Sequence, residues 1–144
     1  METKEFAIRL GVALLAGACI GLERQFHRKN AGLRTNTLVA IGAAVFTMIS
    51  FHFMGGSNVD PTRVIGQIVT GVGFLGAGVI IHQGISIQGL TTAATIWCSA
   101  AMGCLAASGL YLEVLICTAA IVFVNIFFRW IDDFIVRKKG GEPV

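Results

Sequence analysis

Long apolar stretches fill most of the chain, and polar residues interrupt them at only a few places. About 20 residues at 1.5 Å per residue cross a hydrocarbon core of roughly 30 Å, and the stretches approach that length. They predict transmembrane helices over Phe6–Leu22, Thr37–Met54, Val64–Ile81, Leu90–Ala107 and Leu110–Phe128. The last two form one tract that is too long for a single crossing, and Ser108-Gly109 is where it can turn.

Composition supports a membrane protein. Apolar residues make up 55% of the 144 residues and charged residues only 13%, whereas soluble domains average about 25% charged. This balance excludes a disordered chain and a water-soluble enzyme core. We therefore expect an all-α integral membrane protein, with a five-helix membrane domain over residues 1–128 and a short basic tail over 129–144.

The basic residues gather in two segments, the loop 23–36 and the tail after Phe128. Four predicted crossings separate these segments, so both lie on one side of the membrane, which the positive-inside rule makes the cytoplasm. The N-terminus is then outside and the C-terminus cytoplasmic. The basic residues of the two segments are Arg24, Arg28, Lys29 and Arg34, and Arg129, Arg137, Lys138 and Lys139.

Glycines recur in the third apolar stretch. The run 71–76 has the spacing of the dinucleotide fingerprint, but no strand pattern precedes it and no acidic residue follows about twenty positions later, which argues against a nucleotide site. Two interpretations remain. Small residues can let another helix approach closely, or four glycines within 71–78 can interrupt the helix as in ion-coordinating transporters. Packing is favoured because glycine is common in membrane helices.

Small residues one helical turn apart lie on three of the predicted spans. Such faces predict a compact bundle and leave a homodimer open, without indicating which faces are internal. The small-residue faces are Ala13/Gly17/Gly21, Gly66/Thr70 with Gly73/Ala77, and Gly103/Ala107.

Asp60-Pro61 predicts the start of the third helix. Asp at the N-cap accepts a backbone hydrogen bond, and Pro at the first helical position supplies the required φ angle. Arg63 lies three residues further on and can pair with Asp60.

Catalytic and metal-binding patterns do not stand out. The cysteines and histidines have no zinc-type spacing, and no nucleophile has a recognisable base, so we expect no enzyme and no cofactor and leave a metal site open. Only Arg9 and Glu113 bring charge into the spans. Mid-span hydroxyls and amides are weak ligands for Mg²⁺, so they support an ion pathway poorly. These are Thr47, Gln67, Thr70, Thr95, Ser99 and Asn125.

Three motifs in order resemble the MgtC/SapB family of bacterial inner-membrane proteins. The first is Gly21-Leu-Glu23-Arg24 with Ala31-Gly32-Leu33-Arg34-Thr35, the second is Asp60-Pro-Thr-Arg63 leading to Gly71–Gly78, and the third is Gly89–Ala94 with Ile96-Trp97. The resemblance covers the chain from the first span to Asn125. It implies five spans with a cytoplasmic C-terminus, a place in the bacterial inner membrane, and a role in magnesium limitation and, in pathogens, intracellular survival and virulence. It also implies a membrane complex such as the F-type ATP synthase as a partner, and many members carry a further soluble domain.

The motif positions are the candidate interaction residues. We expect Glu23 to pair with an arginine, and the Thr91 and Thr92 hydroxyls to cap the fourth helix. One hypothesis is that the loop 23–36 and the connection 82–92 form a cytoplasmic polar cluster that receives a partner or ligand, and the alternative is that they only hold the bundle together. The candidates are Glu23, Arg24, Gly32, Arg34, Thr35, Asp60, Arg63, Gly73, Gly76, Gly78, Thr91, Thr92 and Asn125.

The sequence thus favours a non-enzymatic membrane regulator or interaction protein, with a transporter or channel for Mg²⁺ or protons as the alternative. Charged residues are scarce within the spans, which weakens the transporter hypothesis, because proton and cation paths through membranes are usually lined by ionisable residues. Expected partners are the lipid bilayer, another membrane complex and a second copy of the chain, and no nucleic acid.

Overall fold

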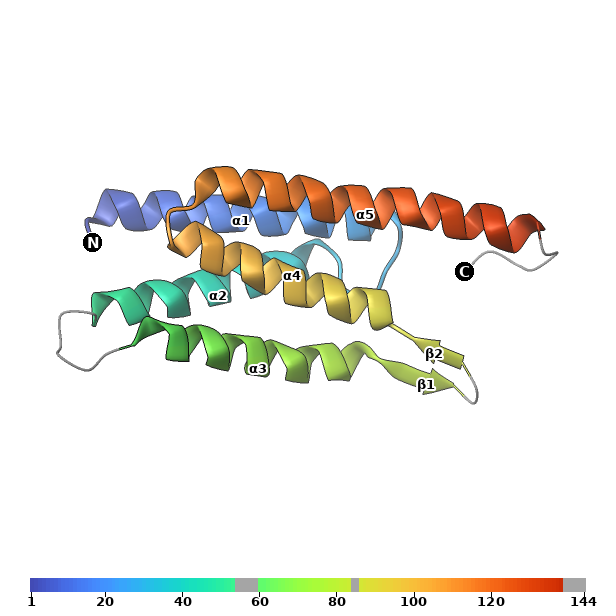
Figure 1. Ribbon diagram of the computed structural model, residues 1–144, viewed down its shortest axis with the longest axis horizontal. Coiled ribbons are helices and arrows are strands. Elements are labelled where there is room, and N and C mark those ends of the chain that lie inside the picture. The colour runs from blue at the N-terminus through green and yellow to red at the C-terminus, as the bar shows by residue number, and fades with distance from the viewer. Residues whose placement is uncertain (54–59, 84–85, 139–144) are drawn as a thin grey trace.

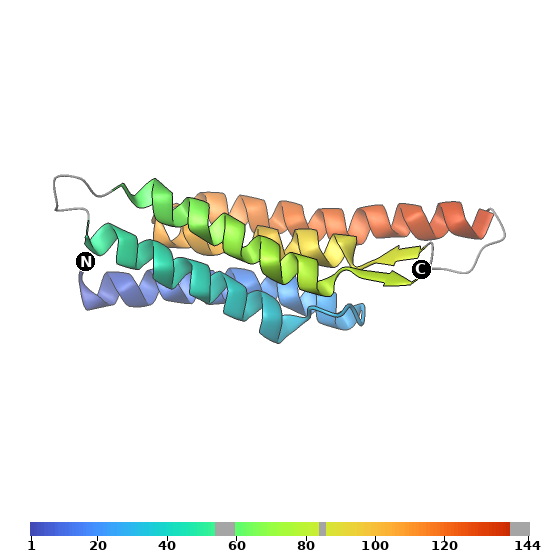
Figure 2. The same ribbon diagram turned by 90° about the horizontal axis from the view of Figure 1, so that it is seen from below.

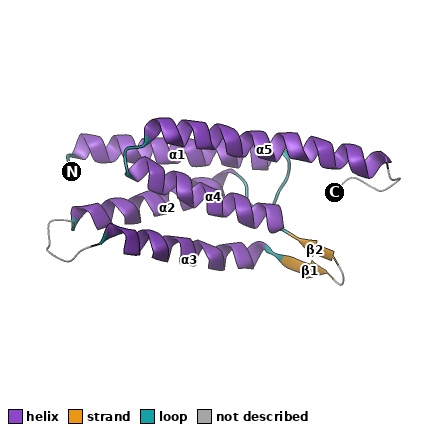
Figure 3. Ribbon diagram, viewed as in Figure 1, coloured by secondary structure: helices purple, strands orange, loops and turns teal. Residues whose placement is uncertain are grey.

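The computed structural model describes residues 1–53, 60–83 and 86–138. In this part of the chain every predicted span is a helix, which confirms the all-α membrane architecture, and each helix is long and apolar enough to cross a bilayer (Figures 1 and 3). The elements are α1 (Thr3–Phe26), α2 (Leu33–His52), α3 (Pro61–Val79), β1 (Ile81–Gln83), β2 (Ser86–Gln88), α4 (Leu90–Ala107) and α5 (Tyr111–Lys138).

Successive helices run in alternating directions, so the N-terminus and the α4–α5 turn lie at one end of the bundle (Figure 1). A hairpin of β1 and β2 lies at the other end, largely within the connection 82–92, with His82 paired to Ile87. The bounds of α4 match the predicted span, whereas α5 continues past the predicted end at Phe128 and projects beyond the other helices (Figure 1).

The core lies between α1, α2 and α4 and consists mainly of small residues. Ala13, Ala44 and Ala106 are completely buried there. A Cβ added at Gly17 would lie 2.8 Å from the Ala40 Cβ, and one added at Gly103 would overlap the Ala40 carbonyl oxygen. The predicted small-residue faces of the first and fourth spans therefore pack inside the chain, because only glycine allows backbones this close.

The third helix behaves differently. It is continuous from Pro61 to Val79, so the interpretation that its glycines interrupt it is wrong. Nothing lies within 4 Å of a Cβ added at Gly66, Gly71, Gly73 or Gly78, so no other helix of this chain approaches closely at these positions. Close packing of this helix with another chain stays a prediction. Seen from below, α3 lies at the edge of the bundle (Figure 2).

The predicted start of the third helix and the predicted turn between the fourth and fifth helices are both confirmed. Asp60 caps α3 and Pro61 is its first residue, and the Asp60 carboxylate accepts hydrogen bonds from the Thr62 N–H at 2.9 Å and the Thr62 hydroxyl at 2.7 Å. The expected ion pair with Arg63 does not form, because Thr62 takes the carboxylate instead. Between α4 and α5, Gly109 has φ +78°, which favours glycine.

Candidate functional site

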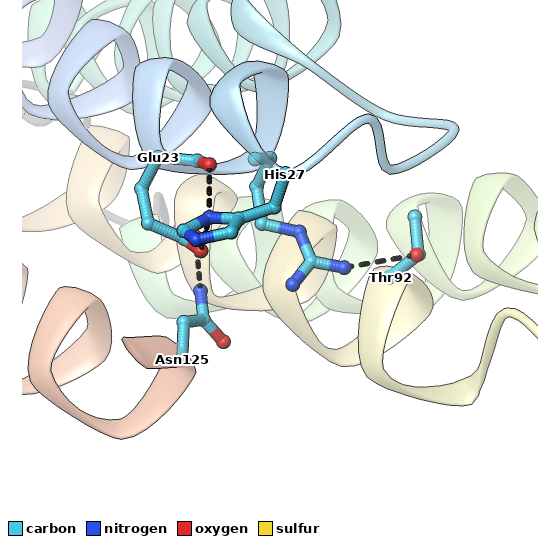
Figure 4. A network of polar contacts seen from close by, with 5 residues as sticks. Glu23, His27, Thr92 and Asn125 are labelled. Atoms are coloured by element: carbon cyan, nitrogen blue, oxygen red, sulfur yellow. Dashed lines mark hydrogen bonds and ion pairs between the residues drawn. The ribbon is translucent and has the colours of Figure 1, made fainter. Parts of the chain in front are cut away.

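Polar side chains from three helices meet near the end of the bundle that carries the hairpin. Glu23 of α1 is only 7% exposed. Its Oε2 accepts a hydrogen bond from Asn125 Nδ2 of α5 at 3.1 Å, and its Oε1 lies 2.9 Å from His27 Nδ1 (Figure 4). Glu23 makes no direct ion pair with an arginine among the described residues, although its charge acts on Arg24 electrostatically. His27 lies one helical turn further along the same face of α1, and its Nδ1 is also 2.8 Å from the Glu23 carbonyl oxygen.

Arg24, the next residue on α1, points to α4. It is 3% exposed, and its Nη2 donates to the Thr92 hydroxyl at 3.1 Å. Thr92 therefore does not cap α4. The N-cap is Gly89, with φ +91° and no side-chain hydrogen bond, and Thr91 is exposed. The contacts of Glu23 and Arg24 tie α1 to α5 and to α4, and we call these residues with His27, Thr92 and Asn125 the inner-end cluster.

A second set of polar groups lies between α2 and α4. Asn36 is completely buried, and its Nδ2 donates to the carbonyl oxygens of Ala31 and Gly32, each at 2.9 Å. Its Oδ1 accepts from the Ser99 hydroxyl at 2.8 Å, and Ser99 also contacts the Thr95 carbonyl oxygen. We call Asn36, Thr95 and Ser99 the polar seam. It consists of neutral groups whose hydrogen-bonding capacity is used within the bundle.

Other candidates lie apart from the cluster. Arg34 and Thr35 are exposed at the start of α2, and a Cβ at Gly32 would overlap the Gln25 side chain. Gly76 faces Ala93 of α4. Gly73 and Gly78 face open space on α3, and Asp60 and Arg63 lie at the opposite end of the bundle. The structure thus joins only Glu23, Arg24, Thr92 and Asn125 of the predicted set.

Sequence reasoning missed His27, Asn36 and Ser99 as site members. The spacing of Glu23 and His27 was a usable signal, since residues four apart on a helix are neighbours. Asn36 had no such signal, because its partner Ser99 lies 63 residues away in the sequence. Among the described residues, no group of three or more His, Cys, Asp or Glu is arranged to hold a metal ion.

Comparison with known proteins identifies close relatives. The MgtC family model matches residues 10–134. The chain is 52% identical to the protein MgtC of Brucella abortus over 92% of its length, and 49% identical to the protein MgtC of Salmonella typhimurium over 86%. It is 47% identical over 94% of its length to an uncharacterised protein of Synechocystis. No solved structure matches the chain.

These matches cover only part of the relatives. The shares are 56% of the Brucella protein, 52% of the Salmonella protein and 57% of the Synechocystis protein, so the chain spans about half the length of the curated relatives that it matches. The family match nevertheless covers α2, α3 and α4 completely and most of α1 and α5. The chain is a multi-pass membrane protein that belongs to the MgtC family.

Proposed function

We propose that this chain is a non-enzymatic regulator of the bacterial inner membrane, which acts by placing α3 against a transmembrane helix of another membrane complex. The observation that carries this proposal is the state of α3. Only Val72 and Gly76 of its residues are buried, although α3 is continuous and long enough to span the bilayer. A spanning helix that packs so little within its own chain is available for packing with another. The span of α5 is also little buried, and the groove beside α3 is what distinguishes α3 from it.

An apolar groove runs between α2 and α3. Its volume is about 520 Å³, and Val39, Gly42, Phe46, Ile68 and Gly71 are among its lining residues. Glycine and alanine let a second backbone come close, which drives association in lipid, where the hydrophobic effect does not distinguish helices from acyl chains. The groove lies along membrane-spanning segments, so its occupant is itself a membrane segment.

Gln67 gives this apolar groove one hydrogen-bonding side chain. It lines the groove, is exposed, and has no hydrogen-bond partner among the described residues. An amide left in hydrocarbon loses its hydrogen bonds to water, and a polar side chain of a neighbouring helix can restore them. The occupant that we propose is therefore a partner helix with a hydrogen-bonding side chain at the depth of Gln67.

Photo-crosslinking in cells tests this proposal. A photoreactive residue at Gln67 should form an adduct with a membrane-complex subunit, identified by mass spectrometry. Gly71→Leu fills the groove and should abolish the adduct. Gly11→Leu is the matched control, since a Cβ at Gly11 also meets nothing within 4 Å but Gly11 lies outside the groove. An adduct only with a second copy of the chain, or an adduct that Gly71→Leu leaves intact, would contradict the proposal.

Family membership supports the biological setting that we propose for this contact. The regulated complex serves adaptation to low magnesium and, in pathogens, intracellular survival, with the ATP synthase as the first candidate. Growth in magnesium-poor medium of a strain that lacks its own family member should be restored by this chain. Gly11→Leu should restore growth equally well, and Gly71→Leu should not.

One observation favours the alternative of a Mg²⁺ or proton transporter. The polar seam is buried and begins at Thr95, three residues after Thr92 of the inner-end cluster on α4. Purified chain in liposomes distinguishes the two functions. As a regulator it should give no more cation flux than empty vesicles, whereas flux that Glu23→Gln abolishes would establish transport.

A further inference from the structure

Arg24 is a buried cation that contacts no carboxylate directly within the described residues, although the neighbouring Glu23 charge acts on it electrostatically. It is 3% exposed, its Nε has no acceptor, and within the described residues its hydrogen bond goes to the neutral Thr92 hydroxyl. The adjacent Glu23 carboxylate faces His27 and Asn125 instead. Burying a charge without an opposite charge in contact costs desolvation free energy, and a bound anion would offset that cost at this guanidinium.

The start of α4 presents a second anion-binding feature at the same place. Gly89 supplies no side-chain cap, and the first backbone bond into the helix is from the Ala93 N–H to the Gly89 carbonyl oxygen. The N–H groups of residues 90, 91 and 92 have no acceptor within the described part of the chain. Free N–H groups and the positive end of the helix dipole favour an anion there.

Arg24 is directed into this helix start. Thr92 is the third residue of α4, and side chains in a helix lean toward its N-terminus, so the hydroxyl that Arg24 contacts lies over the first turn (Figure 4). Glu23 and Arg129 of α5 both act on Arg24 electrostatically, with opposite signs, and the Glu23 charge has the larger effect. The guanidinium and the unbonded N–H groups therefore act on the same small volume.

We infer that the Arg24 guanidinium and the N-terminus of α4 together bind a phosphate group. Guanidinium forks and helix N-termini are both suited to phosphate oxygens. Arg24 follows the apolar stretch of α1 by two residues, and Leu90 begins that of α4, so the site lies at the depth of the lipid headgroups. The same chemistry would accept a phospholipid phosphodiester or free phosphate. The site is separate from the α3 surface and does not rest on it.

Thermal unfolding of the purified full chain, stripped of lipid in detergent, measures this binding. The probes are dihexanoyl phosphatidylglycerol, inorganic phosphate and uncharged dihexanoylglycerol. Binding to the folded state raises the unfolding temperature in a concentration-dependent way. We expect a rise with the phosphatidylglycerol beyond that with dihexanoylglycerol. An equal rise with inorganic phosphate would assign the site to free phosphate, and no rise with either would overturn the inference.

Variants locate the site. Arg24→Gln should raise the apparent Kd about tenfold, the loss expected for a charge-assisted hydrogen bond. Arg34→Gln is the matched control, because it removes an exposed positive charge at the same end and should leave the Kd unchanged. If Arg24→Gln does not fold, Thr92→Val keeps the charge but removes the hydroxyl that orients it, and should raise the Kd about fivefold. An equal rise of the apparent Kd in the Arg24 and Arg34 variants would show that the basic surface attracts the anion non-specifically, and it would contradict a site at Arg24.

Discussion

Asn36 shows how a single buried amide fastens several parts of the chain. Its side chain links the loop before α2, through Ala31 and Gly32, to Ser99 on α4. Asn36→Leu would leave two carbonyl oxygens and a hydroxyl without this partner in a dry interior. We therefore expect a loss of about 2–4 kcal/mol in unfolding free energy, measured by denaturant titration in detergent.

Ser99→Ala provides the comparison for this prediction. It removes one contact to Asn36 but leaves the Asn36 amide bonded to the loop carbonyls, so about 1 kcal/mol should be lost. If Asn36→Leu lost no more unfolding free energy than Ser99→Ala, the Asn36 amide would contribute packing alone and no stabilising hydrogen bonds.

Asp60 should make the start of α3 sensitive to acid. Hydrogen bonds from the Thr62 hydroxyl and N–H, and the nearby positive charge of Arg63, lower the pKa of Asp60 below its usual value. The cap is therefore fully present above the unfolded-state pKa and is lost as the pH falls through the lower folded-state pKa. Hydrogen exchange at the Thr62 amide, compared with that of the uncapped Asp60→Ala variant, should show protection that disappears only in that acidic range.

Asp60→Asn separates the carboxylate's charge from its geometry. The amide oxygen of Asn still accepts at an N-cap but does not titrate in this range. Protection of Thr62 should therefore become independent of pH. Acid loss of protection that persists in Asp60→Asn would show that another group controls the start of α3.

The accuracy of the sequence prediction at single residues depended on how far away the partner lies. Asp60-Pro61 was predictable because capping uses only neighbouring residues. Glu23 and Asn125 are 102 residues apart in the sequence. An acidic residue near the membrane surface could contact many polar side chains, so the sequence did not indicate this partner. The motifs thus identified members of the inner-end cluster, but only the fold could decide which of them touch.

Among the helices, the glycines divide into those that pack internally and those that do not. A Cβ at Gly103 would overlap the Ala40 carbonyl oxygen, whereas one at Gly66 meets nothing within 4 Å. Gly103→Ala must push α2 and α4 apart and should cost about 1–3 kcal/mol. Gly66→Ala should cost nothing or slightly stabilise α3, because alanine has the higher helix propensity. Thermal unfolding of the two variants in detergent checks the contrast, and similar unfolding temperatures would refute it.

The spacing of small residues predicted the packing of α1 and α4 correctly but did not distinguish α3 from them. All three helices carry small residues one turn apart, and the pattern says only that an approach is allowed. The hairpin was missed for a related reason. Its strands are three residues each, too short for an alternating pattern to be separated from a polar loop.

Across the whole molecule, the distribution of polar groups helps to decide between a regulator and a transporter. Charged side chains of the inner-end cluster lie near one end of the bundle, and the polar seam contains only neutral hydroxyl and amide groups. A proton relay within a membrane usually requires ionisable side chains along its path. The seam is therefore better suited to fixing α2 against α4 than to conducting ions, which supports the regulator proposal over transport.

The orientation of the five helices in the membrane is the remaining prediction at this scale. Residue 28 lies in the loop that carries the first basic cluster, and residue 108 lies in the turn at the opposite end of the bundle. In a variant without the four native cysteines, Ser108→Cys should react with a membrane-impermeant maleimide on intact cells, because the positive-inside rule places that turn outside. Arg28→Cys should react only after the membrane is permeabilised, and detergent-solubilised protein labelled at both positions is the control for thiol reactivity. Labelling in the reverse order would place the basic cluster outside and invert the bundle, and the phosphate site inferred at Arg24 would then face the outer leaflet.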